Sequence, residues 1–435
     1  MPFHPIISFL HIKLEGQKAK TSSPLGLKVM HEFMNKEHIL MDNSVGHKSR
    51  LMVRDQDSRE VVYSTCGPFN TQHNPLCHQD DSFALLHFTQ SISIIKSVSI
   101  SVDPSAYPKV ASWNASSSDC CLWDGVTCDD NTCRVISLDL SSSFLSGFIN
   151  TSNTLFRLVH LQTLNLAGNY FNKSQIPSAI GLLSRLTYLN LSNTEFTGQI
   201  PLEFSNLTKL NSLDLSRNYF LEILKPGLAS LVQNLTDLKQ LHLSQVNISS
   251  PVHVLANFSS LTSLLLENCQ LQGEFSACIF KLPNLQFLSV QYNTNLSGYL
   301  PGFFRRSPLK ELRLAGTNFS GEMPNSIRYL ESLNHLDISY CNFSGSMLSS
   351  ISNLSQLLHL ELSGNNFSAG SISSWIGNLT QLERLYMRST QLTGRILSWL
   401  MNLTQLTLLD LSENNFSARS SRLGLVILHI LKDCA

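Results

Sequence analysis

The stretch LTYLNLSNTEFTGQIP, residues 186–201, returns in closely similar form as LKELRLAGTNFSGEMP at residues 309–324. Within the LxLxx core of this unit, leucines alternate with polar residues, and a period of two indicates a short strand that is buried on one side. The full unit, LxxLxLxxN, occurs twelve times, with its middle leucines 23 to 28 residues apart and usually 24. The middle leucines are Leu138, Leu164, Leu189, Leu213, Leu241, Leu264, Leu288, Leu312, Leu336, Leu360, Leu385 and Leu409. Self-similarity at a fixed period predicts a repeat architecture.

A single unit of this kind cannot bury its own leucines, so neighbouring units must stack and join them into one continuous core. Each coil of the stack contributes one strand, and all strands run in the same direction. The sequence therefore predicts an α/β solenoid with a curved parallel β-sheet on the concave side and short helical or irregular segments on the convex side. Outward residues of consecutive strands stack about 4.8 Å apart and form a broad concave surface.

The last position of the unit is usually Asn, Thr or Cys, and it closes the turn after each strand. An asparagine buried there pairs with backbone groups of adjacent coils that otherwise lack partners, which predicts a ladder along the solenoid. The ladder residues are Asn169, Thr194, Asn218, Cys269, Asn293, Thr317, Cys341, Asn365, Thr390 and Asn414. Ser143 and Val246 replace them in the first and fifth units. Cys269 and Cys341 are accordingly predicted to be small buried residues and not nucleophiles.

Composition divides the chain into four parts, which are residues 1–74, 75–134, 135–418 and 419–435. The first part shows no sustained period and is predicted to be irregular or disordered, with a role that the sequence does not identify. The second is a cysteine-rich cap, the third holds the twelve repeats, and the fourth is an irregular tail. In the cap, the run SFALLHFTQSI favours a short amphipathic helix with Asp80 or Asp81 as its N-cap.

Five of the ten cysteines lie close to the start of the repeats; they are Cys77, Cys120, Cys121, Cys128 and Cys133. The end of a solenoid exposes core leucines, and disulfides hold a cap that is too small to fold alone. A zinc site is the alternative for thiolates at this spacing, but the N-glycosylation sequon beside them favours disulfides. Cys66, Cys278 and Cys434 have no partner that the sequence assigns.

N-x-S/T sequons occur sixteen times, at Asn114, Asn150, Asn172, Asn190, Asn206, Asn234, Asn247, Asn257, Asn295, Asn318, Asn342, Asn353, Asn366, Asn378, Asn402 and Asn415. One group lies four residues before the first leucine of a unit and another lies just past the ladder residue, so both are expected on the convex or lateral surface. Asn190 alone is an outward strand residue, and a glycan there would project over the concave surface. Together with the cysteine cap, this pattern predicts an extracellular glycoprotein.

Charge and motifs exclude several functions. Lys and Arg number 31 and so do Asp and Glu, so the formal net charge is zero and no nucleic-acid footprint exists. The sequence lacks phosphate-binding glycine loops, GxSxG, HExxH and kinase signatures, so we expect no enzyme, cofactor or metal site. His242, His335 and His359 are outward strand residues, and we expect no nucleophile beside them. The longest apolar run, LGLVILHIL at 423–431, is too short to span a membrane, and no export signal is clear at the N-terminus.

The unit LxxLxxLxLxxNxFSGxIP resembles the plant-type leucine-rich repeat. The cap sequence, LCHQDDSFALLHF followed by DPSAYPKVASWNASSSDCCLWDGVTC, resembles the N-terminal cap of plant receptor-like proteins, a group that includes kinase-less pathogen receptors. The resemblance covers about residues 75–418. It implies disulfides from Cys77 to Cys120 and from Cys121 to Cys128, with Cys133 unpaired. It also implies extracellular repeats at the plasma membrane, and because the chain has fewer repeats than the family and no membrane helix, we expect a truncated product.

Function is therefore expected to be binding through the concave face. In repeats seven to eleven the outward residues become aromatic and charged: Phe287, Gln291, Tyr292, Glu311, Arg313, His335, Asp337, Tyr340, His359, Glu361, Arg384, Tyr386 and Arg388. Tyrosine and arginine are the residue types favoured at interface hot spots. The leading hypothesis is a receptor ectodomain in defence signalling that binds an extracellular protein, peptide or glycan and acts through a partner receptor kinase. The alternatives are a secreted inhibitor resembling the polygalacturonase-inhibiting proteins and a non-functional receptor fragment.

Overall fold

The computed structural model describes residues 51–54, 60–63, 77–96, 103–114, 119–249, 251–304, 306–346, 349–368, 370–371, 374–394 and 397–416. The chain forms two compact units, Met1–Pro68 and Phe69–Ala435. In the first unit, β1 (Leu51–Arg54) pairs antiparallel with β2 (Glu60–Tyr63). No sequence period predicted this strand pair, and the rest of residues 1–74 lies outside the described residues.

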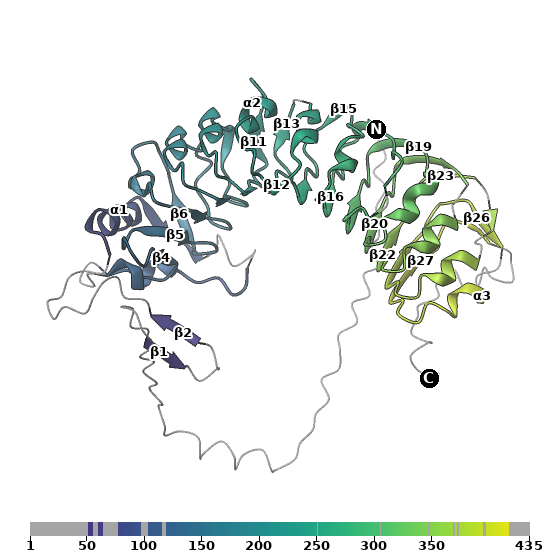
Figure 1. The fold of residues 1–435 in the computed structure, drawn as a ribbon, viewed down its shortest axis with the longest axis horizontal. Helices are drawn as coiled ribbons and strands as arrows, with labels where there is room; N and C mark the ends of the chain where they lie inside the picture. Colours follow the sequence, from purple (N-terminus) through teal and green to yellow (C-terminus); the bar gives the residue numbers. More distant parts are fainter. Residues whose placement is uncertain are drawn as a thin grey trace, which may run out of the picture. The chain divides into compact units, whose positions relative to one another are not determined.

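One long sheet follows the inner side of the arc formed by the second unit (Figure 1). Its strands, one for each repeat, are β5 (Val135–Asp139), β7 (Thr163–Asn165), β8 (Tyr188–Asn190), β10 (Ser212–Asp214), β12 (Gln240–His242), β14 (Ser263–Leu265), β16 (Phe287–Ser289), β18 (Glu311–Arg313), β20 (His335–Asp337), β22 (His359–Glu361), β25 (Arg384–Tyr386) and β27 (Leu408–Asp410). These twelve strands are parallel, and β4 (Val126–Cys128) adds an antiparallel edge beside β5. The predicted α/β solenoid is confirmed.

The strand register shows why the repeat period produces this sheet. Each middle leucine lies opposite the middle leucine of the next coil, from Leu138 opposite Leu164 to Leu385 opposite Leu409. All of them except Leu409 are fully buried. Because side chains alternate across a strand, the residues on either side of each leucine face outward on the concave surface.

Short lateral sheets, which the sequence pattern had not indicated, are built from strands that follow the ladder positions, together with β3 (Ile92–Ile94) of the cap. Their strands are β3 with β6 (Leu145–Gly147); β9 (Thr197–Gln199), β11 (Phe220–Ile223) and β13 (Asn247–Ile248); β15 (Gln272–Glu274), β17 (Asn295–Gly298), β19 (Asn318–Glu322), β21 (Asn342–Gly345) and β23 (Asn366–Phe367); and β24 (Gly370–Ser371), β26 (Leu392–Gly394) and β28 (Asn415–Phe416). Buried phenylalanines support them from inside, and the rings of Phe171 and Phe196 stack with centroids 5.1 Å apart.

The convex side carries one short helix in most coils, and the arc in Figure 1 has these helices outermost. The helices of the repeats are η4 (Thr154–Arg157), η5 (Ser178–Leu182), η6 (Leu202–Asn206), α2 (Leu228–Val232), η7 (His253–Asn257), η8 (Ile279–Lys281), η9 (Asn325–Tyr329), η10 (Ser349–Asn353), η11 (Ser374–Asn378) and α3 (Leu397–Leu400), where η marks a 3-10 helix. Pro177, Pro201 and Pro324 stand directly before three of them, since proline fixes φ and needs no backbone donor at a helix start.

The structure confirms the predicted ladder, and Asn218 shows how it works. Its Oδ1 accepts hydrogen bonds from the backbone N–H groups of Thr194 at 3.2 Å and Phe196 at 3.0 Å in the preceding coil. Its Nδ2 donates to the carbonyls of Leu191 at 2.8 Å and Leu215 at 2.9 Å. One buried side chain therefore satisfies groups of two coils, which fixes their spacing.

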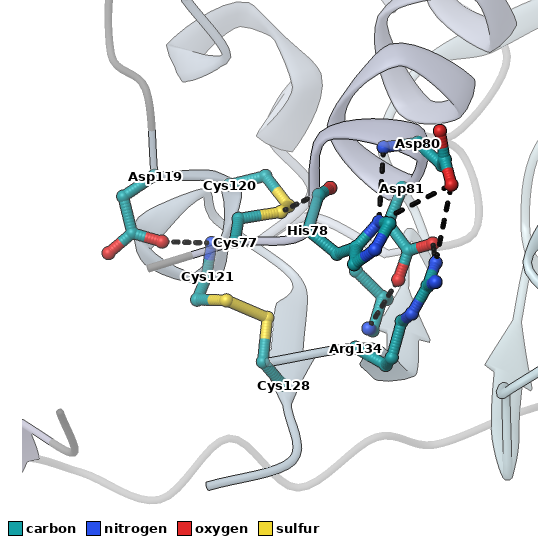
Figure 2. The surroundings of a disulfide bond; sticks show 10 residues. Cys77, His78, Asp80, Asp81, Asp119, Cys120, Cys121, Cys128 and Arg134 are labelled. Carbon is teal, nitrogen blue, oxygen red and sulfur yellow. Dashed lines mark hydrogen bonds and ion pairs between the residues drawn. A yellow bond between two sulfur atoms is a disulfide. The ribbon is translucent and has the colours of Figure 1, made fainter. Parts of the chain in front are cut away.

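The cap contains α1 (Gln79–Gln90), η2 (Lys109–Ser112) and η3 (Cys120–Leu122). The predicted aspartate N-cap of α1 is wrong: the side chain of His78 accepts from the backbone N–H of Asp80. Asp81 is buried instead, and it accepts from Arg134 Nη1 at 3.0 Å and from the Val135 N–H at 2.9 Å (Figure 2). This carboxylate fastens the cap helix to the first strand of the repeats.

Two disulfides close the cap, Cys77–Cys120 and Cys121–Cys128, and they are the pairs that the resemblance implied (Figure 2). Cys133 has a free thiol. Trp113 and Trp123 stack with ring centroids 5.4 Å apart and are buried. The cap thus covers the end of the leucine core with a small covalently closed layer.

Candidate functional site

The outward residues of the strands form two parallel rows on the concave face. The first concave row consists of the first residues of the strands, and in the later coils it reads Phe287, Glu311, His335, His359 and Arg384. The second concave row consists of the third residues, and there it reads Ser289, Arg313, Asp337, Glu361 and Tyr386. Parallel pairing in register places each member directly beside the next.

All thirteen residues predicted to bind a ligand lie on the coils of β16 to β25. Nine belong to the two rows, and Gln291, Tyr292, Tyr340 and Arg388 lie in the turns that follow the strands. They are not equally accessible: Tyr292 and Tyr340 are each 61% exposed, whereas Gln291 and Asp337 are only 7% and 5% exposed. The sequence placed these residues on one face but did not separate surface side chains from supporting ones.

Asp337 has a supporting role inside this face. Gln291 Nε2 donates to its Oδ2 at 2.6 Å, although the two residues are 46 positions apart in the chain. Its Oδ1 accepts from the backbone N–H of Ser339 at 3.0 Å and from the Ser339 hydroxyl at 2.7 Å. Burial raises the pKa of Asp337 above its ordinary value, and the hydrogen bonds from Ser339 oppose this effect.

The neighbouring charges are paired unevenly. Arg313 Nη2 lies 2.6 Å from Glu311 Oε2 and 3.4 Å from His335 Nδ1. Burial, followed by the charge of Arg313, lowers the pKa of His335 to about 3, so this imidazole is neutral at physiological pH. Burial and the neighbouring Asp337 raise the pKa of Glu361 to about 7. No hydrogen bond or ion pair to the Glu361 carboxylate occurs among the residues that the structure describes.

Tyr292 and Tyr340 are fixed by the coils that follow them. Both have positive φ, 60° and 50°, in the turn before the ladder residue. A Cβ on Gly316 would lie 3.2 Å from Tyr292 Cδ1, and one on Gly364 would lie 2.5 Å from Tyr340 Cδ1. Each tyrosine ring therefore lies directly against a glycine of the next coil while its other side stays exposed, which makes a rigid aromatic contact surface.

One expectation about the histidines is wrong. His242 Nε2 lies 2.8 Å from the hydroxyl of Ser263, and His242 Nδ1 lies 3.7 Å from Asp214 Oδ2. The three side chains come from consecutive strands β10, β12 and β14, so the repeat geometry does place a hydroxyl beside an imidazole. Ser263 is only 6% exposed. Asp214, His242 and Ser263 therefore form a row of polar contacts with one another within the sheet.

Two groups of side chains consist of residue types that can bind a metal ion. The cap cysteines Cys77, Cys120, Cys121 and Cys128 form one group, but their thiols are joined in disulfides. In the other, His335, Asp337 and Glu361 offer atoms within 4.8 Å of one another. Arg313 points a donor at the His335 imidazole, which disfavours a cation close to this nitrogen.

A shallow pocket, which the sequence pattern did not indicate, lies beside the strands of the early coils. Its volume is about 340 Å³ and it is lined by Gln162, Arg185, Thr187 and Lys209. These residues stand just before β7, β8 and β10, where the backbone N–H groups of Thr187 and Tyr188 both donate to the Gln162 carbonyl. The sequence could have indicated this pocket, because Arg185 and Lys209 occupy equivalent positions in successive repeats.

The sequons lie largely where the repeat register predicted. Asn206, Asn257, Asn353 and Asn378 end convex helices, and all four are exposed. The second group begins lateral strands, at Asn318, Asn342, Asn366 and Asn415. Asn190 ends β8 on the concave side and is half-buried. Among the described residues, no helix has both the length and the apolar composition to cross a membrane.

Comparison with known proteins identifies the repeat type. A family model described as "Leucine-rich repeat region" matches residues 109–303 and 305–432, and one described as "Leucine rich repeat N-terminal domain" matches residues 78–129. Receptor-like protein 6 of Arabidopsis thaliana is 40% identical over 294 residues, which cover 64% of this chain and 30% of that protein. Receptor-like protein Cf-9 of Solanum pimpinellifolium is 35% identical over 268 residues, covering 59% and 31%. The chain thus spans less than a third of the length of these relatives.

Solved structures show the same architecture. The crystal structure of a TDR receptor aligns with a TM-score of 0.52 at 31% identity, covering 61% of this chain and 45% of that one. A plant ice-binding protein aligns with a TM-score of 0.55 at 27% identity, covering 68% and 89%.

Proposed function

The chain belongs to the leucine-rich repeat family as a plant receptor-like protein, and from this premise we propose that it is the ligand-binding ectodomain of a kinase-less cell-surface receptor. The ligand is an extracellular protein, peptide or glycan that binds the concave face from β16 to β25. One observation carries this assignment. Exposed tyrosine rings fixed on glycines lie over the same strands as carboxylates and an arginine that the protein pairs incompletely.

The finer part of the proposal is a role in defence or pathogen recognition. We place the repeats outside the cell at the plasma membrane, with a partner receptor kinase supplying the kinase activity. The resemblance of cap and repeats to receptor-like proteins supports this part. The disulfides of the cap and the exposed sequons support an extracellular location.

The test is binding of fractionated culture filtrate from a leaf pathogen to the immobilised full chain, wild type against a Tyr340→Ala, Tyr386→Ala, Arg388→Ala triple variant. Each anchor is expected to cost roughly 2 kcal/mol of binding free energy, so the triple variant should lose detectable binding. Ser212→Ala, on the first concave row of the early coils, is the matched control and should bind as the wild type does. Unchanged binding by the triple variant would contradict the proposed site. Inhibition of a fungal polygalacturonase by the wild-type chain would favour the inhibitor alternative.

A further inference from the structure

The second concave row contains polar groups that the protein leaves without partners. The hydroxyl of Ser289, which is 1% exposed, and Nε of Arg313 are buried and accept or donate no hydrogen bond in the described part of the chain. The half-buried carboxylate of Glu361, two strands further along from Arg313, also has no hydrogen-bond or ion-pair partner in that part of the chain. Buried polar groups are normally satisfied, so the two buried groups of this row, on the same row as an unpaired carboxylate, indicate that a ligand supplies their partners.

The charges around Glu361 specify what the ligand must supply at that end of the row. Asp337 lies directly beside Glu361 in the register, and its carboxylate is held in place by Gln291 and Ser339. The two arginines in range do not neutralise Glu361: Arg313 is engaged with Glu311, and Arg384 is exposed on the first row without an ion pair to Glu361. The His335 imidazole is neutral. Neither of these adjacent carboxyl groups forms an ion pair in the described structure, although the charges of Arg313 and Arg384 partly offset that of Glu361.

Aromatic rings border the same position. Tyr386 lies beside Glu361 in the register, on the next strand. The raised pKa of Tyr292 is due first to burial and then to the charges of Asp337 and Glu361, which places that ring within electrostatic reach of both carboxylates. Tyr340 follows Ser339, which holds Asp337. Tyrosine faces attract cations through the ring quadrupole, so rings and carboxylates favour the same kind of group.

We propose that Glu361, supported by Asp337 and Tyr386, binds the guanidinium or ammonium group of an arginine or lysine side chain in the ligand. This inference rests on the proposed function and deepens it by naming the ligand as a peptide with a basic residue. Arg313 Nε and the Ser289 hydroxyl then bind backbone carbonyls of the same segment. Ser289 and Glu361 are three strand intervals apart, roughly 14 Å, which an extended peptide crosses in about four residues.

The experiment uses the full chain and four pools of capped heptapeptides that differ only in a fixed central residue: arginine, lysine, citrulline or norleucine. Citrulline has the shape of arginine without its charge, and norleucine lacks the lysine ammonium. We expect the arginine and lysine pools to bind about tenfold more tightly than the neutral pools, as is typical of a charge-assisted contact. Glu361→Gln should remove this preference. Glu322→Gln, on the lateral strand β19 two coils before Glu361, should preserve it.

Folding of the variant is checked by its thermal midpoint. Glu361 loses no partner when it becomes glutamine, so Glu361→Gln should melt at or above the wild-type temperature. Equal binding of charged and neutral pools would overturn the cation site. If those pools still bind and the Tyr340, Tyr386 and Arg388 triple variant abolishes their binding, the proposed concave function survives while this inference fails.

Calorimetric titration with Mn²⁺ and Zn²⁺ forms a separate arm of the experiment. Binding of either metal that Glu361→Gln abolishes, without a preference for basic peptides, would assign the carboxylates to a metal ion and overturn the proposal.

Discussion

The early and late halves of the concave face share one backbone and differ in how their polar side chains are paired. In the early half, β5 to β14, outward carboxylates meet partners within the protein. Asp139 accepts from Lys109 Nζ of the cap at 3.0 Å, and Asp214 accepts from the Ser216 N–H at 2.9 Å and lies near His242. In the late half, β16 to β25, Glu361 has no such partner in the described structure.

The pKa values of the outward carboxyl groups also differ between the early and late halves. Burial would raise the pKa of Asp139 and of Asp214, but hydrogen bonds from Ser141 and Lys109 in one case, and from His242 and Ser216 in the other, lower it overall. In the late half burial prevails, and the pKa of Glu361 rises to about 7. A surface that pairs its own charges needs no partner, whereas an unpaired, half-buried charge such as that of Glu361 costs free energy that ligand binding can recover. This difference therefore supports the proposal that ligands bind the late half.

The largest expected effect concerns the cap, which supports the early half directly. Cys121→Ser opens the Cys121–Cys128 disulfide and should cost roughly 2–5 kcal/mol, as is typical for a small secreted module. The measurements are secretion yield, thermal midpoint and hydrogen exchange, and exchange should rise more in β5 to β8 than in β18 to β22. Cys278→Ser, at an exposed free thiol, is the control and should change nothing. An unaltered midpoint and yield in Cys121→Ser would show that the cap does not depend on this bond.

Ladder substitutions test whether the two halves have equivalent backbones. Asn218→Ala leaves the Phe196 N–H and the Leu215 carbonyl without partners, and Asn293→Ala does the same to the Leu271 N–H and the Leu266 carbonyl in the late half. Each should cost about 2–4 kcal/mol of unfolding free energy, because each orphans buried backbone groups.

Denaturant unfolding measures both variants against the exposed Asn353→Ala, which should stay within about 0.5 kcal/mol of the wild type. A large cost in one half alone would mean that the backbones differ and that pairing of the outward side chains is not the main distinction.

The sequence predicted the fold because the leucine period is a backbone property that every coil repeats. Middle leucines at intervals near 24 residues imply stacking, and a buried asparagine after each strand implies the ladder that Asn218 displays. The lateral sheets escaped prediction because their NFSG segments are polar on the outside and include glycines such as Gly321 with φ of 91°. A short polar segment that contains glycine has the sequence pattern of a turn and not of a strand.

The candidate site was predicted only as a face. The pairing of outward side chains depends on the length of each side chain and on the residues beside it, and the repeat pattern specifies neither. Gln291 reaches Asp337 across the intervening coil, and His242 reaches Ser263 diagonally between the two rows. The sequence shows which residues share a face, but it does not show that Asp337 is a support and Glu361 an unpaired group.

Two carboxylate substitutions, one in each half, should affect stability in opposite directions. The folded pKa of Asp214 is depressed, so its stabilising contribution exists above its ordinary pKa near 3.8 and disappears as pH falls. Asp214→Asn should therefore cost about 1–2 kcal/mol at pH 7 and progressively less in acid. The folded pKa of Glu361 is raised from 4.5 to about 7, so the stability linked to its proton is complete below 4.5 and is lost as pH rises through 7.

Thermal melts from pH 4 to pH 8 compare wild type, Asp214→Asn and Glu361→Gln. The groups facing Glu361 are Asp337, Arg313 and Arg384, and they are unchanged in Glu361→Gln. Relative to this variant, the wild-type midpoint should fall between pH 4.5 and pH 8. A wild-type advantage that grows with pH over that range would mean that Glu361 has a stabilising partner and would remove the contrast between the halves.

The smallest expected effect is that of Asn190→Gln in the early half. Asn190 Nδ2 donates to the Tyr188 hydroxyl at 3.3 Å, and its Oδ1 accepts from the Ser192 N–H at 2.9 Å, so the side chain is held along the concave surface. Glutamine is one methylene longer and abolishes any glycan at this sequon, but it touches nothing in β16 to β25. Binding of the arginine pool by Asn190→Gln should therefore stay within about twofold of the wild type, since distant sites act independently. The mass of the secreted chain reports whether a glycan was removed. A gain in affinity that accompanies loss of that glycan would show that ligands also occupy the early coils, and the site would then extend across both halves of the face.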